Sequence, residues 1–223
     1  MKEEDFFDRL LLLPLFQGIG RGDFAEIAER IRLGFQKKAK GSVLAKQDEL
    51  STGLFFVLSG EVCAHKLSDF NDYELFEWLN MPLVLQPECL FGLSTRYTRT
   101  FTATSDVQML RVEKDAVRDI LFYYPTFRIN YLNLLSTRAQ LSSRLLWRNV
   151  SKDLRSRFIQ FLSARCLRPA GRKELHIGMI ALADELLATR LRVSQMLNNL
   201  AEEGLVELHR ENIVVPNMER LLM

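Results

Sequence analysis

The hydrophobic period of the chain changes near residue 113, and this change constrains the fold more than any other feature. Between residues 33 and 112 the apolar runs are short and are separated by turn residues, which is typical of strands. From residue 114 onward apolar residues recur three and four positions apart, which is typical of amphipathic helices. We therefore expect an α+β fold, in which a β-rich part precedes a helical part.

The β-rich part contains a series of short candidate strands. They are expected at residues 33–35, 43–45, 54–58, 61–65, 73–79, 83–85, 101–103 and 107–112. Ser59-Gly60 and Asn71-Asp72 separate neighbouring runs and are typical of hairpin turns. Short strands at this spacing predict a small sandwich or barrel.

Helices are expected on both sides of this part, at residues 3–13, 23–31, 114–122, 125–148, 152–164, 179–187 and 190–203. Pro125 suits the first turn of its helix, because its missing N–H would be unpaired there anyway. Residues 165–173, with Pro169 and Gly171, are expected to form a loop.

Composition excludes several classes of protein. The three cysteines, Cys63, Cys89 and Cys166, are far apart, so neither a metal site nor an iron–sulfur cluster is expected. No signal peptide or membrane-spanning run is found, and we expect a cytoplasmic protein without a membrane partner. Paired carboxylates, phosphate-binding glycine loops and zinc-type spacings are also missing from the sequence. We therefore expect no enzyme and no catalytic residues.

Charge is distributed unevenly along the chain. Residues 1–137 contain 16 Lys+Arg and 19 Asp+Glu, a net charge of −3, whereas residues 138–223 contain 14 and 9, a net charge of +5. The second part could face a polyanion, and a solvated surface without a partner is the alternative.

The helix expected at residues 125–148 has two apolar stripes, which indicates two packing partners. One partner can be the β-rich part, and the other can be the same helix of a second copy. The alternative is that both stripes pack within one chain. The residues expected at a homodimer interface are Phe127, Tyr131, Leu134, Leu135, Leu141 and Leu145.

The last fifty residues carry the clearest functional pattern. Two short helices, at 179–187 and 190–203, are joined by a tight turn, which predicts a helix-turn-helix. Thr189 is expected to cap the second helix, and Gly204 is expected to end it. Residues 205–208 and 212–215 predict a hairpin around His209-Arg210-Glu211, which would form a wing.

Arginine and glutamine at the start of the second helix suit contacts with bases. Arginine can bind guanine through two hydrogen bonds, and glutamine can bind adenine in the same way. Arg210, at the tip of the wing, suits a phosphate contact. A helix-turn-helix that binds only protein is the alternative. The expected DNA-binding residues are Thr189, Arg190, Leu191, Arg192, Ser194, Gln195 and Arg210.

With these segments in order, the chain resembles the cyclic-AMP receptor protein and FNR superfamily of bacterial transcription regulators. The resemblance rests on the segments 13–19 (LPLFQGI), 54–62 (LFFVLSGEV), 101–106 (FTATSD) and 180–215. It implies a cyclic-nucleotide-binding-like barrel of jelly-roll type over residues 1–113, a dimerisation helix and hinge over 114–148, and a winged helix-turn-helix over 149–223. It also implies a homodimer on a pseudo-palindromic site in double-stranded DNA, and RNA polymerase as a partner.

The sequence departs from this family at the nucleotide-binding segment. Members that bind cyclic nucleotides carry a Gly-Glu pair, a short phosphate-binding segment and an Arg-Ser pair. The match places Gly92-Leu93 and Tyr97-Thr98 at the two pairs, so the ribose acceptor and the phosphate partner are both replaced. Arg96 or Arg99 could take the place of the arginine only after a register shift. These six residues form the candidate effector pocket, and we do not expect it to bind cyclic AMP.

Other ligands are left open by the sequence. The cysteine cluster of FNR is missing, and the pocket could hold an apolar ligand or haem, or be unused. His65 and the cysteines are candidate haem ligands, although a single histidine on a strand is more often structural. Leu191 replaces a glutamate found in many members, so the preferred DNA site should differ. We expect a DNA-binding transcription regulator; the alternative is a small-molecule or haem-sensing module that acts through a protein partner.

Overall fold

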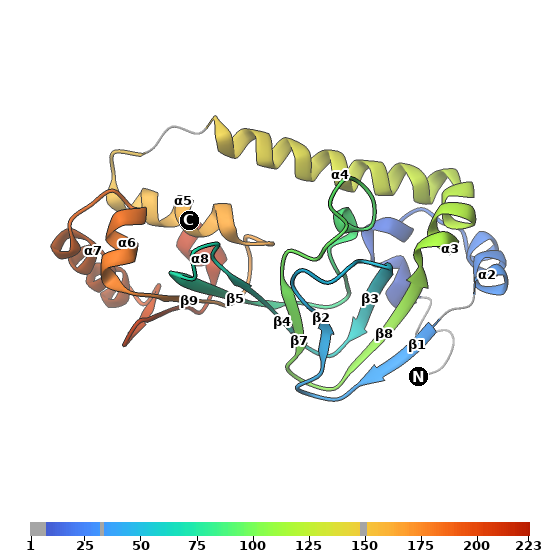
Figure 1. The fold of residues 1–223 in the computed structure, drawn as a ribbon, viewed down its shortest axis with the longest axis horizontal. Coiled ribbons are helices and arrows are strands. Elements are labelled where there is room, and N and C mark those ends of the chain that lie inside the picture. The colour runs from blue at the N-terminus through green and yellow to red at the C-terminus, as the bar shows by residue number, and fades with distance from the viewer. Residues whose placement is uncertain (1–7, 32–33, 148–150) are drawn as a thin grey trace. The chain divides into compact units, whose positions relative to one another are not determined.

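The computed structural model describes residues 8–31, 34–147 and 151–223. The chain divides into two compact units, whose elements are labelled in Figure 1. Unit 1 consists of Met1–Val62 and Asn80–Leu146, and unit 2 consists of Cys63–Leu79 and Trp147–Met223. Each unit has its own hydrophobic core. No helix within the described ranges is long and apolar enough to cross a bilayer.

Unit 1 contains a four-stranded antiparallel sheet with the strand order β1-β8-β3-β6. These strands are Gly34–Lys38 (β1), Val107–Glu113 (β8), Gly53–Ser59 (β3) and Leu83–Val84 (β6). Strand β2 (Val43–Ala45) pairs with β7 (Thr100–Ala103). The strands form open sheets and not a closed barrel, which corrects that part of the expectation and remains consistent with a jelly roll.

The turn that follows β3 requires glycine. Gly60 has a φ of 97°, and a Cβ at this position would lie 2.5 Å from the backbone oxygen of Asp106. The backbone therefore passes too close for any side chain at this point. A turn is present at Ser59-Gly60 as expected, but it is not a hairpin turn, because β3 and the strand that follows it, β4 (Val62–Leu67), belong to different sheets.

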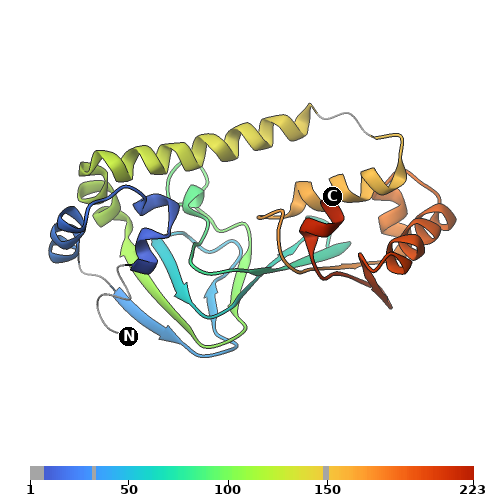
Figure 2. The same ribbon diagram turned by 180° about the vertical axis from the view of Figure 1, so that it is seen from behind.

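Helices cover one side of this sheet and close the core of unit 1. They are η1 (Pro14–Phe16), α2 (Arg21–Arg30), η2 (Pro87–Cys89), α3 (Lys114–Asp119), η3 (Leu121–Tyr123) and the long α4 (Pro125–Leu146). Figure 2 shows the N-terminal segment beside the first turns of α4. Phe16 lies at this contact, and its ring centroid is 5.5 Å from that of Phe24 and 5.4 Å from that of Phe127.

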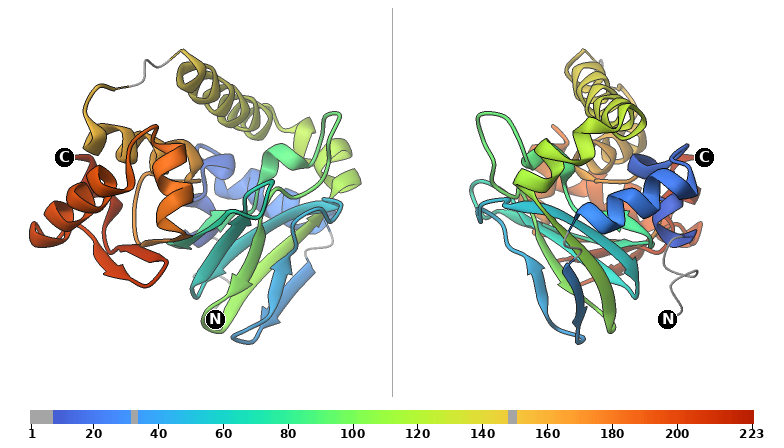
Figure 3. Two further views of the ribbon diagram at one scale, coloured as in Figure 1. Left: turned by 60° about the vertical axis from the view of Figure 1, so that its left-hand side comes forward. Right: turned by 90° about the vertical axis from the view of Figure 1, so that its right-hand side faces the viewer.

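Unit 2 combines a sheet with the C-terminal helices. Its strands are β4 (Val62–Leu67), β5 (Tyr73–Leu79), β9 (Lys173–Ile177), β10 (Glu207–His209) and β11 (Asn212–Val215), in the order β10-β11-β9-β5-β4. Its helices are α5 (Leu154–Arg165), α6 (Met179–Glu185), α7 (Arg190–Glu202) and α8 (Met218–Leu222). Helices α6 and α7 lie side by side, as Figure 3 shows.

Strand β9 was not expected from the sequence. The predicted loop ends where β9 begins, and β9 pairs with β5 on one side and with β11 on the other. Residues 63–79 therefore join the sheet of unit 2, although they precede the first C-terminal helix by about 75 residues of chain.

Candidate nucleic-acid interface

The helix-turn-helix forms as expected around the apolar residues of α6 and α7. Val193, Met196, Leu197 and Leu200 of α7 are buried against Leu182 and Ala183 of α6. The side chain of Thr189 accepts a hydrogen bond from the backbone N–H of Arg192, at 3.4 Å, so the expected N-cap is confirmed. Gly204, with a φ of 67°, follows the C-cap residue of α7.

The turn between α6 and α7 contains a residue in a strained conformation. Leu187 has a φ of 48°, a region that side chains other than glycine, asparagine and aspartate rarely adopt. Arg157 of α5 donates hydrogen bonds to the carbonyl oxygens of Leu186 and Leu187, at 2.6 and 3.0 Å. Arg157 therefore holds the turn that sets the direction of α7. Arg157 was not expected from the sequence, because a single arginine on a helix gives no signal of its own.

The exposed face of α7 carries the residues expected to contact DNA. Arg190, Leu191, Arg192 and Gln195 are exposed, and Ser194 is half-buried. Leu191 is 69% exposed although it is apolar. The first turn of α7 contains two arginines and no acidic residue, which opposes the helix dipole at a cost of about 0.3–1 kcal/mol for each charge. An anion bound at this end would remove that penalty.

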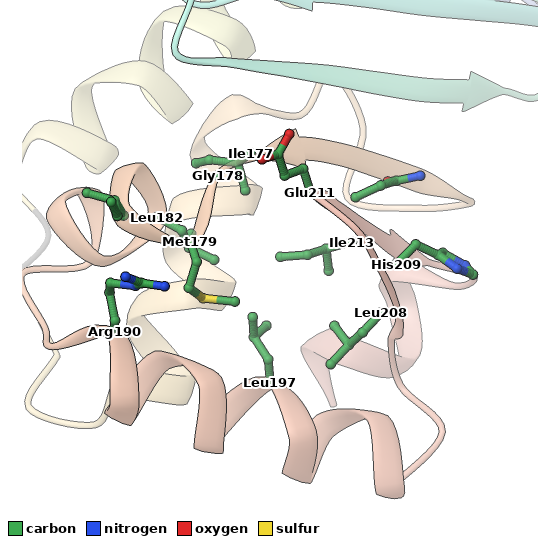
Figure 4. Close-up of a pocket in the computed structure, with 12 residues that line it drawn as sticks. Ile177, Gly178, Met179, Leu182, Arg190, Leu197, Leu208, His209, Glu211 and Ile213 are labelled. Carbon is green, nitrogen blue, oxygen red and sulfur yellow. The ribbon is translucent and has the colours of Figure 1, made fainter.

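The wing is a tight hairpin with Arg210 at its tip. His209 pairs with Asn212, so Arg210 and Glu211 alone form the turn. Arg210 is exposed, and Glu211 has a φ of 54°. A groove of about 340 Å³ separates α7 from the wing, and Figure 4 shows Arg190 on its α7 side and His209 and Glu211 on its wing side.

The arginines of unit 2 differ in what they contact. Arg155 forms an ion pair with Glu203 at 2.7 Å, and Arg165 forms one with Glu185 at 2.8 Å. Within the described part of the chain, no carboxylate lies within ion-pair distance of Arg190, Arg192 or Arg210. Arg155 and Arg165 are thus paired with carboxylates, whereas the arginines of α7 and the wing keep their charge for an external anion.

The candidate effector residues differ widely in exposure. Gly92 lies in a turn with a φ of 101°, and Leu93 is fully exposed. Tyr97 is 3% exposed, and burial raises the pKa of its hydroxyl. Arg99 is also buried.

Hydrogen bonds within unit 1 occupy the polar groups of this segment. The side chain of Gln86 donates to Thr98 Oγ1 at 2.5 Å and accepts from the Thr98 N–H at 3.0 Å. Arg96 donates to the carbonyl oxygen of Asp48 at 2.5 Å. The arginine nearest to the expected phosphate position is therefore used to bind the protein's own backbone.

The candidate haem ligands lie in different surroundings. His65 stacks on Phe76 with ring centroids 4.4 Å apart, and its Nε2 atom is 3.2 Å from Glu74. Cys63 is buried, and desolvation raises the pKa of its thiol to about 11. Burial also raises the pKa of Cys89. Among the described residues, no group of three His, Cys, Asp or Glu side chains could hold a metal ion.

The long helix α4 places the expected interface residues in two environments. Phe127 and Tyr131 are buried in the core of unit 1, where the Tyr131 hydroxyl donates to the carbonyl oxygen of Pro87 at 2.6 Å. Leu134 and Leu135 are partly buried against the same core, and only Leu141 is exposed. The side chain of Leu145 lies outside the described residues. The bulky aromatic stripe therefore contacts the chain's own sheet, and a different stripe faces outward.

Two family models match the chain in sequence order. The cyclic nucleotide-binding domain matches residues 35–124, and the Crp-like helix-turn-helix domain matches residues 156–223. The chain belongs to the Crp/FNR family of transcription regulators. As a Crp/FNR-family protein it is a DNA-binding regulator and not an enzyme.

Curated relatives and solved structures agree with the Crp/FNR assignment. The global nitrogen regulator of Synechococcus elongatus is 24% identical over 219 residues, which cover 92% of this chain and 93% of that protein. The global nitrogen regulator of Synechocystis is 27% identical over 177 residues, covering 74% and 76%. The crystal structure of the Thermus thermophilus catabolite activator protein shares the fold, with 22% identity, a TM-score of 0.53 and coverage of 94% and 96%.

Proposed function

We propose that this Crp/FNR-family regulator binds a pseudo-palindromic DNA site as a homodimer and reads it with helix α7. The observation that carries the proposal is the lack of an ion-pair partner, among the described residues, for Arg190, Arg192 and Arg210. Cations that stay unpaired beside a helix N-terminus lower the stability of the free protein. A bound polyanion would offset this loss of stability, which accounts for the presence of these cations.

Each exposed residue of α7 suits a particular contact. Arg190 and Arg192 can bind guanine, and Gln195 can bind adenine. Leu191 can contact a thymine methyl group, and this position cannot accept a hydrogen bond from cytosine. Arg210 would contact phosphate from the wing and would therefore contribute affinity without sequence preference.

A second copy of the chain is the partner that best fits the outer face of α4. Ile129, Leu132, Ser136, Ala139 and Ser143 follow a three-and-four spacing along the helix, and all are exposed. Ile129 and Leu132 are about half exposed although they are large and apolar. Small residues further along the same stripe would let two helices approach closely, in a coiled-coil arrangement.

The effector of this regulator is proposed to be a small molecule other than cyclic AMP. Leu93 points to solvent where the ribose acceptor is expected, and Tyr97 is buried where the phosphate partner is expected. The expected arginine position holds Tyr97, and the neighbouring Arg96 already donates to the carbonyl oxygen of Asp48. RNA polymerase is the proposed protein partner at promoters.

The experiment that tests the proposal measures DNA binding by fluorescence anisotropy. The site is first selected from a random DNA pool with the full-length protein. The double variant Arg190→Ala, Arg192→Ala should lose about 30- to 25,000-fold in affinity for that site, since each of the two arginine–guanine contacts is worth about 1–3 kcal/mol. Its affinity for unrelated DNA should change much less.

A matched control removes the same charge from unit 1. Lys37 and Lys40 are exposed, and the variant Lys37→Ala, Lys40→Ala should bind the selected site as the unchanged protein does. Equal loss in both double variants would point to net charge alone. No salt-dependent DNA binding at all would favour a sensing module that acts through a protein partner.

A further inference from the structure

We propose that the β4–β5 hairpin, residues 63–79, is a working part of the DNA-binding unit, and that its Tyr73 positions the helix-turn-helix through Arg165 and Glu185. The inference rests on the proposed role of α7 in reading DNA. The cyclic nucleotide-binding domain model includes these residues, yet they belong to unit 2 of the structure. A segment assigned to the sensor domain by sequence is thus built into the module that binds DNA.

The first support is the pairing of β5 with β9. Five residue pairs, from Tyr73–Ile177 to Glu77–Lys173, join the two strands in antiparallel register. Leu75 is buried in the same core as Leu175 and Ile177. Backbone hydrogen bonds on one side and apolar packing on the other make β5 a strand of this sheet and not a surface contact.

The second support is an ion pair at the far end of the two strands. Glu77 and Lys173 are completely buried, with 3.2 Å between Oε2 and Nζ. The Glu77 carboxylate also accepts hydrogen bonds from the Leu167 N–H at 2.9 and 3.0 Å, and Lys173 donates to the carbonyl oxygen of Ala170 at 2.6 Å. Glu77 thus joins the hairpin to β9 and to the loop that follows α5, and Lys173 joins β9 to the same loop.

The third support is a direct path from the hairpin to the helix-turn-helix. Arg165 Nε donates to the Tyr73 hydroxyl at 2.6 Å, and Arg165 Nη2 lies 2.8 Å from Glu185 Oε2. The same guanidinium lies over the Phe161 ring, 3.9 Å from its centroid. Glu185 ends α6, two residues before the strained Leu187. Tyr73 therefore fixes the arginine that holds the end of α6.

The consequence concerns how a signal can reach α7. The hairpin is covalently continuous at both ends with unit 1, so a change there can be passed to α6 by Tyr73 without passing along α4. Loss of the Tyr73 hydroxyl should leave the aromatic contact with Phe161, at 5.5 Å, in place. It should remove one of the bonds that orient Arg165.

The test compares Tyr73→Phe with the control Tyr123→Phe, which alters an exposed tyrosine of unit 1. Both full-length variants are titrated with the selected site and with unrelated DNA, and amide exchange is measured across α6 and the turn. Tyr73→Phe should weaken specific binding about 10-fold to 150-fold, as expected for one hydrogen bond to a charged group. Non-specific binding should stay the same, exchange at residues 185–189 should rise, and the control should change nothing.

A double-mutant cycle with Glu185→Gln shows whether Tyr73 acts on α6 through Arg165 or only on its immediate neighbours. If Tyr73 and Glu185 act through Arg165, the combined loss of specific affinity should be smaller than the product of the single losses. The inference would be overturned if the two losses of affinity were independent, or if Tyr73→Phe left specific affinity and amide exchange unchanged. This holds provided that Arg190→Ala, Arg192→Ala still loses specific binding. If that double variant bound normally, the proposed role of α7 would fail instead. Should Tyr73→Phe fold poorly, Glu185→Gln alone carries the same test.

Discussion

Arg157 donates a hydrogen bond to the carbonyl oxygen of Leu187, at 3.0 Å, and so supports the one strained residue between the two helices of the helix-turn-helix. Arg157→Ala should lower the free energy of unfolding by about 1.5–3 kcal/mol, the usual range for hydrogen bonds to a charged group. Specific DNA binding should fall with it, because α7 loses its fixed direction. Urea denaturation and anisotropy titration of the same sample check both effects.

Leu187→Asn should stabilise the same turn that Arg157→Ala destabilises. Asparagine tolerates a positive φ, so this variant should raise the free energy of unfolding by about 1 kcal/mol. A destabilised Leu187→Asn protein would show that the leucine side chain, which is 75% exposed, contributes more than its backbone strain costs.

The buried pair of Glu77 and Lys173 should be sensitive to the loss of one partner. Glu77→Gln leaves the ammonium group of Lys173 buried without its counter-charge, which should cost about 3–5 kcal/mol. The double variant Glu77→Leu, Lys173→Met removes both charges and should recover most of that stability. Urea unfolding followed by circular dichroism checks this order, and a double variant as unstable as Glu77→Gln would contradict it.

The outer face of α4 should control the oligomeric state. Leu132→Arg places a charge at the centre of the exposed apolar stripe and should convert the proposed dimer into a monomer. Asn133→Arg makes the same addition one residue further along, outside the stripe, and should leave the dimer intact. Sedimentation velocity distinguishes the two, and identical behaviour of both variants would argue against this interface.

The wing should contribute to affinity through charge. Arg210→Ala should weaken binding to all DNA sequences alike and reduce the slope of log affinity against log salt by about one. Glu211→Asn should strengthen binding to all DNA sequences and increase that slope, because it removes a negative charge beside Arg210. Asparagine also tolerates the φ of 54° at this position. A series of titrations between low and high salt measures both slopes. A change confined to one DNA sequence would mean that Arg210 contacts a base.

The buried thiols should react slowly in the folded protein. With a pKa of about 11, Cys63 is ionised to about one part in a thousand at pH 8, whereas an ordinary thiol is ionised to about a quarter. Alkylation of Cys63 by iodoacetamide should therefore rise about tenfold for each pH unit up to pH 10, and should become fast after unfolding. Mass spectrometry of timed samples checks this; a plateau near pH 8.5 would contradict the raised pKa.

Sequence periodicity was enough to predict most elements of both units. Strand β5 and strand β2 begin and end where the apolar runs predicted, and the core residues of α7 are those expected. The apolar residues of β5 and α7 recur with a clear period, and β2 is a short apolar run, so local sequence contains the information. Thr189 and Gly204 mark the ends of α7 for the same reason.

The remaining features depend on contacts between residues that are far apart in sequence, so they could not be predicted from local patterns. Strand β9 begins with Lys173, which is buried only because Glu77 lies beside it, and no local pattern shows a partner so far away in sequence. The two stripes of α4 were both apolar, so periodicity could not say which one faced the sheet. Phe127 and Tyr131 fill the core of unit 1, where large aromatic side chains bury the most area. Arg157 could be found only once the carbonyl groups of the turn were placed.

Because β5 comes from the middle of the chain, the DNA-binding module is not a segment that can be excised or grafted. A fragment spanning residues 147–223 would lack the strand beside β9 and the counter-charge of Lys173. A chimera that joins this C-terminal segment to the sensor of another regulator would supply a foreign strand at the same edge. Recombination between such regulators is therefore constrained by one hairpin, which must be exchanged together with the helix-turn-helix it supports.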